Sequence, residues 1–351
     1  MSENLIEVRD LTVYFETDEG TVKAVDGVNL DIKRGRTLGI VGESGCGKSV
    51  TSQALLRIVP SPGKITGKML LYEKDHKPLD TPIDLVPLPS NGREIRSIRG
   101  GTIAMIFQEP MKAFSPLYTI GNQITEGIML HNEPDYSKAR EMAIEVLREV
   151  GMANPERRID EYPHQLSGGM RQRAMIAMAL SCNPSLLICD EPTTALDVTV
   201  QAQVLKMIND LKNGRNATVM FITHDLGVIA EMADDVAVMY LGKVVEYSNV
   251  DTIFHNARHP YTLSLLKSIP SLLDDDDEGE GAGRKRKKLF TIEGTVPYAM
   301  NLPPGCGFYS RCPFGVDGRC NVEDIPFIER STNHYVRCVF ADKLDTTKLE
   351  V

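Results

Sequence analysis

A glycine-rich run near the N-terminus has the residue types and spacing of a phosphate-binding loop. It reads Gly42-Glu43-Ser44-Gly45-Cys46-Gly47-Lys48-Ser49. Glycines let the backbone wind so that successive N–H groups face a phosphate, and a following helix adds positive potential at its N-terminus. In this pattern Lys48 would reach the β- and γ-phosphates, and the Ser49 hydroxyl would ligate Mg²⁺. The apolar run 37–41 before the loop and a helix expected from near Val50 complete the strand, loop and helix context that the motif requires.

Two adjacent carboxylates follow another apolar run. The run from Leu186 to Cys189 predicts a buried strand, and Asp190 and Glu191 come directly after it. In a parallel sheet such residues reach the same edge as the phosphate loop. Asp190 suits a contact to Mg²⁺ through oxygen, and Glu191 could polarise a water for attack on the γ-phosphate.

The elements that must position these groups form an alternating pattern. Runs 37–41, 103–107, 186–189 and 219–223 are nearly all apolar, as expected of strands covered on both faces. Between the second and third, apolar residues recur at helical spacing from Ser137, a candidate N-cap, to Gly151, which ends the run. This alternation, which continues to about Leu273, predicts an α/β fold with a largely parallel sheet.

Charge and composition exclude several classes of function. Lys plus Arg count 39 against 48 for Asp plus Glu, a net charge of -9, which argues against a surface built for nucleic acid. The longest charge-free stretch, 174–189, is shorter than a membrane-spanning helix and contains Asn183 and Pro184. The N-terminus has acidic residues and lacks the pattern of a signal peptide, so we expect the chain to stay in the cytosol.

The composition of the sequence changes after residue 273. The stretch 274–288 contains an acidic run and then a basic run, which predicts a solvated linker between residues 1–273 and 289–351. The final segment contains four of the seven cysteines, Cys306, Cys312, Cys320 and Cys338. In a small module of little apolar content they could be buried thiols, a structural zinc site or the ligands of a 4Fe-4S cluster. The absence of pairs two to four residues apart argues against zinc.

The segment Leu166-Ser167-Gly168-Gly169-Met170-Arg171-Gln172 resembles the signature sequence of the ATP-binding subunits of ABC transporters. A Ser167-Gly168-Gly169 turn that opens a helix makes an anion site from backbone N–H groups and the helix dipole. The other landmarks of that family occur in the same order along the chain: Phe15 or Tyr14 for the adenine-stacking aromatic, Gln108 for the Q-loop residue, Ala195-Leu196-Asp197 for the D-loop and His224 for the switch histidine.

This resemblance implies a fold and a mechanism. The fold would be a P-loop ABC ATPase domain with a parallel core, an antiparallel N-terminal β-subdomain and a helical subdomain at about 109–182, followed by a small Cys-rich C-terminal extension. Two such domains would form a head-to-tail dimer in which each ATP lies between one phosphate loop and the other subunit's Ser-Gly-Gly turn. Gln108, which also contacts Mg²⁺, and His224 would sense the γ-phosphate, and Glu191 would act on the attacking water.

Further motifs are similar to those of the first ATPase subunit of oligopeptide and dipeptide importers: Phe107 to Pro110, Arg171 to Leu180 and His259-Pro260-Tyr261-Thr262. That family implies a heterodimer with a paralogous ATPase on two permease subunits at the cytoplasmic face of the membrane, served indirectly by a substrate-binding protein. The cargo would be peptides, with nickel or short sugars as alternatives. A soluble ABC ATPase that acts on nucleic acid or ribosomes is the rival class, but its usual coiled-coil insertion or second nucleotide domain is not evident.

The same resemblance bears on the four late cysteines. Some peptide-importer ATPases have a 4Fe-4S cluster in the C-terminal extension, which favours iron over zinc for Cys306, Cys312, Cys320 and Cys338. Its expected role is structural, because ATP hydrolysis needs no redox step and no flavin motif is visible. We therefore expect ATP, Mg²⁺ and this cluster, with Zn²⁺ as the alternative, to be the cofactors.

Overall fold

The core of the computed structural model is one large mixed sheet. The structure describes residues 2–109, 113–194, 198–215, 217–269, 291–300, 302 and 304–344. The strands of the sheet, in chain order, are β3 (Thr37–Val41), β6 (Ile103–Ile106), β7 (Leu186–Asp190), β8 (Thr218–Thr223), β9 (Asp235–Tyr240), β10 (Lys243–Asn249), β11 (Ile328–Ser331) and β12 (His334–Val336). Their spatial order is β11-β12-β10-β9-β3-β8-β7-β6.

Five of the eight strands of this sheet have the parallel pairing that the sequence predicts. β9, β3, β8, β7 and β6 are parallel neighbours, whereas β10, β12 and β11 continue the sheet in antiparallel order. The four predicted strands are confirmed as β3, β6, β7 and β8, with ends that differ by one residue at most. Because the parallel strands run in one direction, their carboxyl ends lie at one edge.

A second, antiparallel sheet is formed near the N-terminus. It contains β1 (Asn4–Thr17), β2 (Gly20–Lys33), β4 (Gly63–Lys74) and β5 (Lys77–Asp84) in the order β2-β1-β4-β5. All three pairings in it are antiparallel, which confirms the expected N-terminal β-subdomain.

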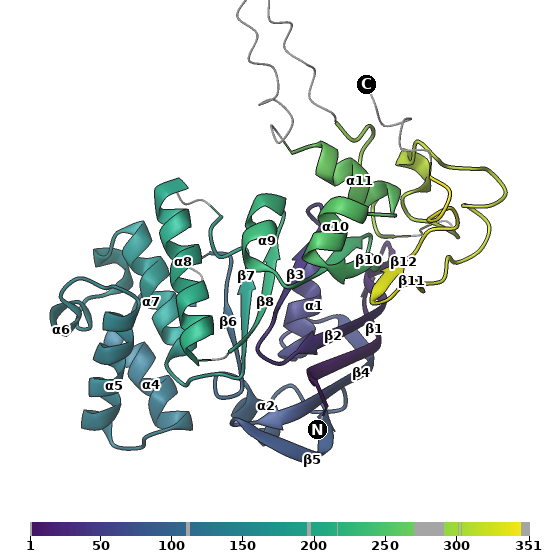
Figure 1. Ribbon diagram of the computed structural model, residues 1–351. Helices are drawn as coiled ribbons and strands as arrows, with labels where there is room; N and C mark the ends of the chain where they lie inside the picture. The colour runs from purple at the N-terminus through teal and green to yellow at the C-terminus, as the bar shows by residue number, and fades with distance from the viewer. Residues whose placement is uncertain are drawn as a thin grey trace, which may run out of the picture.

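Helices flank the main sheet on both sides and at one end. They are α1 (Lys48–Leu55), α2 (Arg93–Ile98), α4 (Ile120–His131), α5 (Tyr136–Glu149), α6 (Pro155–Arg158), α7 (Gly168–Leu180), α8 (Val198–Arg215), α9 (Leu226–Met232), α10 (Val250–Asn256) and α11 (Pro260–Lys267), with 3-10 turns at Pro163–Gln165 and Tyr309–Arg311. Figure 1 shows α4 to α7 grouped beyond β6, and this group is the predicted helical subdomain. In the described part of the chain, no helix combines the length and the apolar composition that crossing a bilayer requires.

The helix predicted from the apolar periodicity is α5, but its predicted N-cap is wrong. Asp135, not Ser137, caps it by accepting a hydrogen bond from the backbone N–H of Lys138 at 3.0 Å. An aspartate carboxylate is at least as good an N-cap as a serine hydroxyl, and the helix begins directly after it. The predicted end is correct, because Gly151 adopts φ 70° just beyond the helix.

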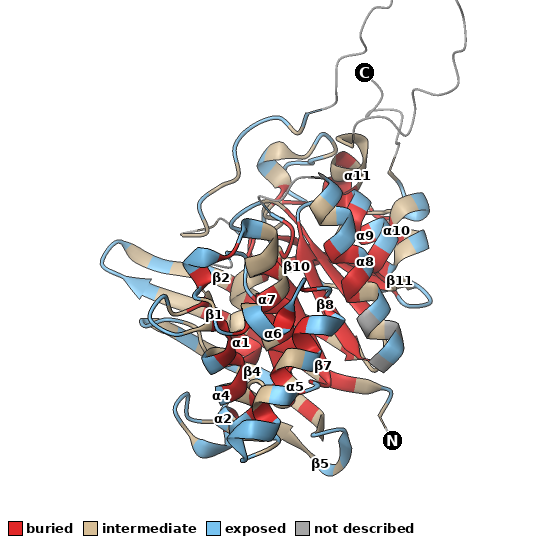
Figure 2. Cartoon of the chain, turned by 90° about the vertical axis from the view of Figure 1, so that its left-hand side faces the viewer, coloured by how far each residue is buried: buried red, intermediate tan, exposed pale blue. Residues whose placement is uncertain are grey.

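The alternation of side chains along the parallel strands divides the hydrophobic core into two clusters. Leu187 and Cys189 of β7 belong to one cluster, and Leu186 and Ile188 belong to the other. Successive side chains of a strand point to opposite faces, so each cluster lies on one face of the sheet. Figure 2 shows the buried strands between helices that expose their outer sides.

The C-terminal segment, expected to be a module of its own, is joined to both sheets where it is described. β12 pairs with β10 of the main sheet, and the backbone N–H of Lys23 in β2 donates to the carbonyl of Ala299 at 2.9 Å. Phe308 is 1% exposed and packs edge-on against Tyr240 of β9, with ring centroids 5.3 Å apart. The predicted charged linker 274–288 lies outside the described residues.

Phe308→Ala should therefore lower the free energy of unfolding by about 3–5 kcal/mol, because it removes a fully buried aromatic ring. Urea denaturation of the full chain measures this. Phe327→Ala, in the same segment but only partly buried, is the matched control and should cost about half of that or less. Equal effects of the two substitutions would contradict the packing described here.

Candidate functional site

The predicted phosphate loop connects β3 to α1 and is closely surrounded by backbone. Gly45 and Gly47 adopt φ 80° and 102°, a region that favours glycine. A Cβ atom at Gly47 would lie 2.2 Å from the carbonyl oxygen of Ala24, so a larger residue does not fit there. Lys48 is buried, and its ammonium group donates to the carbonyls of Gly42 and Glu43 at 2.8 and 3.1 Å. The Lys48 ammonium and the first turn of α1, which includes Val50, therefore both lie beside the loop.

Ser49 and Asp190 meet beside this loop. The Ser49 hydroxyl donates to Oδ1 of Asp190 at 3.0 Å, across 141 residues of sequence. Burial at the end of β7 raises the pKa of Asp190 to about 6, and the hydrogen bond from Ser49 partly opposes that shift. A hydroxyl and a carboxylate at this distance offer two of the oxygen ligands that Mg²⁺ prefers.

Glu191 is the centre of a set of polar side chains from three strand ends. Its Oε2 accepts hydrogen bonds from Nε2 of Gln108 at 2.9 Å and from Oγ1 of Thr194 at 3.0 Å, and its Oε1 lies 3.3 Å from Nδ1 of His224. Glu191 itself has φ 45°, an unusual left-handed conformation for a residue with a side chain. The structure thus brings together Gln108, Glu191 and His224, which the sequence analysis selected from separate segments.

The Ser-Gly-Gly turn occupies the predicted place at the start of a helix. Ser167 is the N-cap of α7, where its hydroxyl accepts from the backbone N–H of Met170 at 3.4 Å. Ser167 and Gly168 are exposed, whereas Gln172, one turn further along, is buried and donates to the carbonyl of Pro192 next to Glu191. In the view of Figure 1, α7 lies to the left of β6 with the other helices of that group, whereas α1 lies to the right of β6.

The two candidate adenine-stacking aromatics differ in their surroundings. The Tyr14 hydroxyl donates to Asp26, and the Lys23 ammonium lies 5.5 Å from the centroid of the Tyr14 ring. Phe15 points to the opposite face of β1 and packs, partly buried, with the cluster that includes Val50 of α1. The Phe15 ring lies beside the segment that follows α1, since a Cβ atom at Gly63 would lie 2.8 Å from it. The predicted D-loop residue Asp197 lies outside the described residues.

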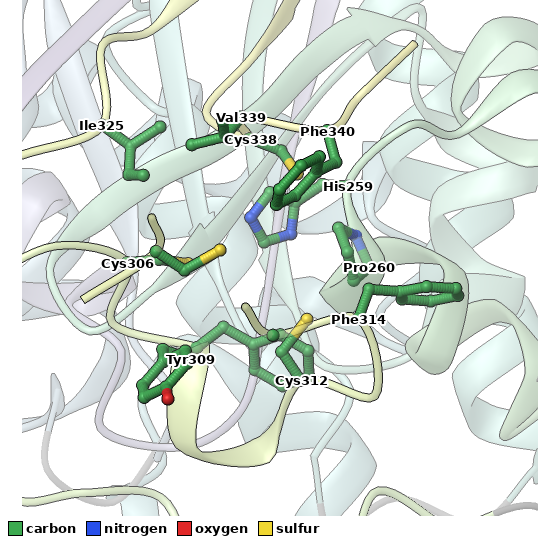
Figure 3. A pocket seen from close by; sticks show the side chains of 13 residues that line it. His259, Pro260, Cys306, Tyr309, Cys312, Phe314, Ile325, Cys338, Val339 and Phe340 are labelled. Carbon is green, nitrogen blue, oxygen red and sulfur yellow. The ribbon is translucent and has the colours of Figure 1, made fainter. Parts of the chain in front are cut away.

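The four late cysteines line one small pocket, which we call the cysteine pocket. It is lined by Cys306, Cys312, Cys320, Cys338, Phe308 and His259, among others. Figure 3 shows the sulfur atoms of Cys306, Cys312 and Cys338 turned toward a common space. Burial raises the pKa of Cys312 and of Cys338 to about 12. Within the described ranges, no three His, Cys, Asp or Glu side chains form a group that could hold a metal ion.

Some functional neighbours were not predicted. Thr194 follows Glu191 by three residues, and its hydroxyl could have been suspected from that spacing alone. The ion pair between Arg311 and Glu43 of the phosphate loop joins residues 268 positions apart, and no local pattern indicates it.

Comparisons with known proteins agree with this site. Residues 25–194 match the family model described as ABC transporter, and residues 245–320 match the model described as oligopeptide/dipeptide transporter, C-terminal region. The first match includes the phosphate loop, Gln108 and Glu191, and the second includes three of the four late cysteines.

Curated relatives are similar over nearly their whole length. A probable peptide ABC transporter ATP-binding protein, y4tR, of Sinorhizobium fredii is 47% identical over 95% of this chain and 94% of its own. The oligopeptide transport ATP-binding protein OppD of Bacillus subtilis is 45% identical over 95% of this chain and 88% of its own. The dipeptide transport ATP-binding protein DppD of Bacillus subtilis is 44% identical, over 97% and 96%.

A solved structure is similar in fold to most of the chain. The dimeric ATP-binding cassette MJ0796, in a post-hydrolysis state bound to ADP and Pi, superimposes with a TM-score of 0.60 at 26% identity. The match covers 70% of this chain and 98% of that one. This likeness and the family models confirm the predicted ABC ATPase fold.

The raised pKa of Asp190 predicts a pH dependence of magnesium binding. At a pH below about 6 a proton occupies this carboxyl, so Mg²⁺ must displace it, whereas above that pH the carboxylate is free. The Mg²⁺ concentration that half-saturates ATP binding should thus rise as the pH is lowered through about 6. Magnesium titrations at several pH values, read by a fluorescent ATP analogue, measure this.

Asp190→Asn is the control for this prediction. It should need more Mg²⁺ at every pH, and its requirement should change less with pH than that of the wild type, because only the terminal phosphate of the nucleotide still titrates in this range. A wild-type requirement that changes with pH no more than that of Asp190→Asn would show that Asp190 is not a ligand of the metal.

Proposed function

This chain belongs to the oligopeptide and dipeptide branch of the ABC transporter ATP-binding subunits, and from that membership we propose that it hydrolyses ATP to power the import of peptides. The observation that supports this proposal best is the arrangement at one sheet edge of the phosphate loop, the Ser49 and Asp190 pair, and Glu191 with its partners Gln108 and His224. These are the parts that phosphoryl transfer to water requires.

Binding of the nucleotide is assigned to one group of residues. Backbone N–H groups from Gly42 to Ser49, together with Lys48, hold the phosphates, and Ser49, Gln108 and Asp190 contact Mg²⁺. Phe15 or its neighbour Tyr14 stacks on the adenine. Mg²⁺ supplies charge neutralisation on the phosphate oxygens.

The hydrolytic step is assigned to Glu191. Two side-chain donors, from Gln108 and Thr194, fix its Oε2, and His224 lies beside its Oε1. A carboxylate held in this way can accept a hydrogen bond from a water and align it with the γ-phosphate. Gln108 and His224, being in contact with the same carboxylate, can report to it whether the γ-phosphate is present.

The site is proposed to be completed by a second subunit. Ser167 and Gly168 of the turn that opens α7 are exposed, as expected if this turn serves the nucleotide of a partner. We infer that the partner is a paralogous ATPase, because the resemblance to peptide importers implies such a pair. Asp197 would lie at the joint between the two subunits.

The place of action is proposed to be the cytoplasmic face of the cell membrane. The described chain contains no helix fit to span a bilayer, and the relatives are ATP-binding proteins of transporters. Two permease subunits would therefore supply the path for the peptide, and a substrate-binding protein would deliver it from outside.

We also propose that the cysteine pocket holds a 4Fe-4S cluster with a structural role. Four thiols on one buried pocket are a suitable donor set for such a cluster. Because burial raises the pKa of Cys312 and Cys338 to about 12, a bound cation is needed to keep these side chains as thiolates. A single structural zinc held by the same cysteines is the alternative.

Glu191→Gln should abolish turnover and leave ATP binding largely intact. The amide keeps the shape of the side chain but cannot activate water, so ATPase activity in the assembled transporter should fall by about 10² to 10⁴-fold. Lys48→Ala should instead weaken ATP binding itself, by roughly tenfold or more. Steady-state hydrolysis and equilibrium binding, measured on the same preparations, separate the two effects.

The isolated chain provides the control for the composite site. At low concentration it should bind ATP but hydrolyse it slowly, since the second Ser-Gly-Gly turn is missing. A Glu191→Gln transporter that hydrolyses ATP at the normal rate would refute the role of Glu191, and full activity of the isolated monomer would refute the composite site.

Protein purified without oxygen should be brown and contain about four irons per chain. Replacing Cys320 by Ser should lower the iron content and loosen the C-terminal segment. Cys182→Ser, a buried cysteine outside the pocket, is the matched control and should keep the iron. Elemental analysis and the visible spectrum measure the outcome, and colourless protein with one zinc per chain would exclude the cluster.

A further inference from the structure

The phosphate loop is joined to the C-terminal segment by a buried ion pair. The Arg311 guanidinium donates two hydrogen bonds to the Glu43 carboxylate, from Nη1 to Oε2 at 2.7 Å and from Nη2 to Oε1 at 3.1 Å. The arginine side chain is only 5% exposed. Its Nε donates to the carbonyl of Glu293 at 3.1 Å, which fixes the plane of the guanidinium. Paired bonds of this kind are the strongest and most directional that an arginine forms with a carboxylate.

A second contact connects the same loop residue to the same region. The backbone N–H of Glu43 donates to the Tyr261 hydroxyl at 2.8 Å. The Tyr261 ring is fully buried and packs against Phe308, with centroids 5.3 Å apart. Phe308 lines the cysteine pocket, and Arg311 is the neighbour of Cys312 in the sequence. The pocket and the loop thus share two connections that converge on Glu43.

Glu43 in turn contacts the residue that reaches for phosphate. Its carbonyl oxygen accepts from the Lys48 ammonium at 3.1 Å. A carboxylate within a loop that receives a triphosphate is unfavourable, because it repels the ligand unless a cation neutralises it. Arg311 is the cation that the structure pairs with this carboxylate.

We propose that Arg311 is a positioning residue of the phosphate loop and that it makes ATP affinity depend on the cysteine pocket. The proposal rests on the proposed function, in that the loop Gly42–Ser49 must bind ATP. When the walls of the pocket are intact, Arg311 neutralises Glu43 and holds the loop open to phosphate. When they are disturbed, Arg311 is displaced and Glu43 opposes the incoming triphosphate.

The test uses the full-length chain and the fluorescent nucleotide methylanthraniloyl-ATP with Mg²⁺. Arg311→Ala should raise the dissociation constant at least about fivefold, the lower end of usual coupling between sites. Glu43→Gln removes the charge that needs compensation and keeps the backbone of the loop, so it should bind more tightly than Arg311→Ala. The double variant should bind more tightly than Arg311→Ala alone, because no carboxylate is left uncompensated.

Arg319→Ala is the matched control. Arg319 is an exposed arginine of the same segment, and its side chain has no contact with the phosphate loop in the described structure. Its removal should leave the affinity unchanged. The proposal is overturned if Arg311→Ala binds like wild type, if Glu43→Gln does not restore binding to it, or if Arg319→Ala is weakened equally.

A further variant tests whether the cysteine pocket is coupled to ATP binding. Cys312→Ser should weaken binding at least about twofold in the wild-type background and should have no effect in the Glu43→Gln background. No loss in the wild type, or an equal loss in both backgrounds, would refute the coupling. Lys48→Ala distinguishes a failure of the coupling proposal from a failure of the proposed function. If the wild-type chain binds the nucleotide no better than Lys48→Ala, the loop is not a nucleotide site.

Discussion

The parallel pairing of β6, β7, β8 and β3 is the constraint on which the nucleotide site depends. Ile106 is opposite Cys189 in one pair and Val41 is opposite Thr223 in another, so all four strands end at nearly the same level. The residues after those ends then meet without any long loop. A shift of one residue in any strand would exchange the side chains that pack into the two core clusters, so the core that holds the register also holds the catalytic geometry.

The sheet edge formed by these strand ends contains several carboxylates at the place where a triphosphate must bind. Glu43, Asp190 and Glu191 all lie there, and each is contacted by a different kind of partner. Asp190 receives the hydroxyl of Ser49, Glu191 receives neutral donors, and Glu43 receives the guanidinium of Arg311. Only the last pairing cancels a full charge, which suits a carboxylate that has no assigned task in binding metal or water. The charge balance of the loop is therefore set by a residue from the other end of the chain.

Sequence patterns predicted the parts of this arrangement whose signals are local. The strand 37–41 and the loop 42–49 are contiguous, and their chemistry follows from adjacent residues. The cap of α5 was missed because Asp135 and Ser137 are both suitable caps, and only the backbone decides between them. Arg311 was missed because its partner is 268 residues away. Strands as short as β11 and β12 have no pattern of their own, since they exist through pairing that begins at β10.

The surroundings of the phosphate loop explain why the C-terminal segment can act on it. A Cβ atom at Gly42 would lie 2.2 Å from the carbonyl oxygen of Met239, and the N–H of Gly242 donates to the carbonyl of Cys46 at 3.0 Å. The loop is thus in contact with the end of β9 and with the turn into β10, the strand to which β12 is paired. Segments packed this closely do not move independently. A change in the cysteine pocket therefore reaches the loop through atoms already in contact.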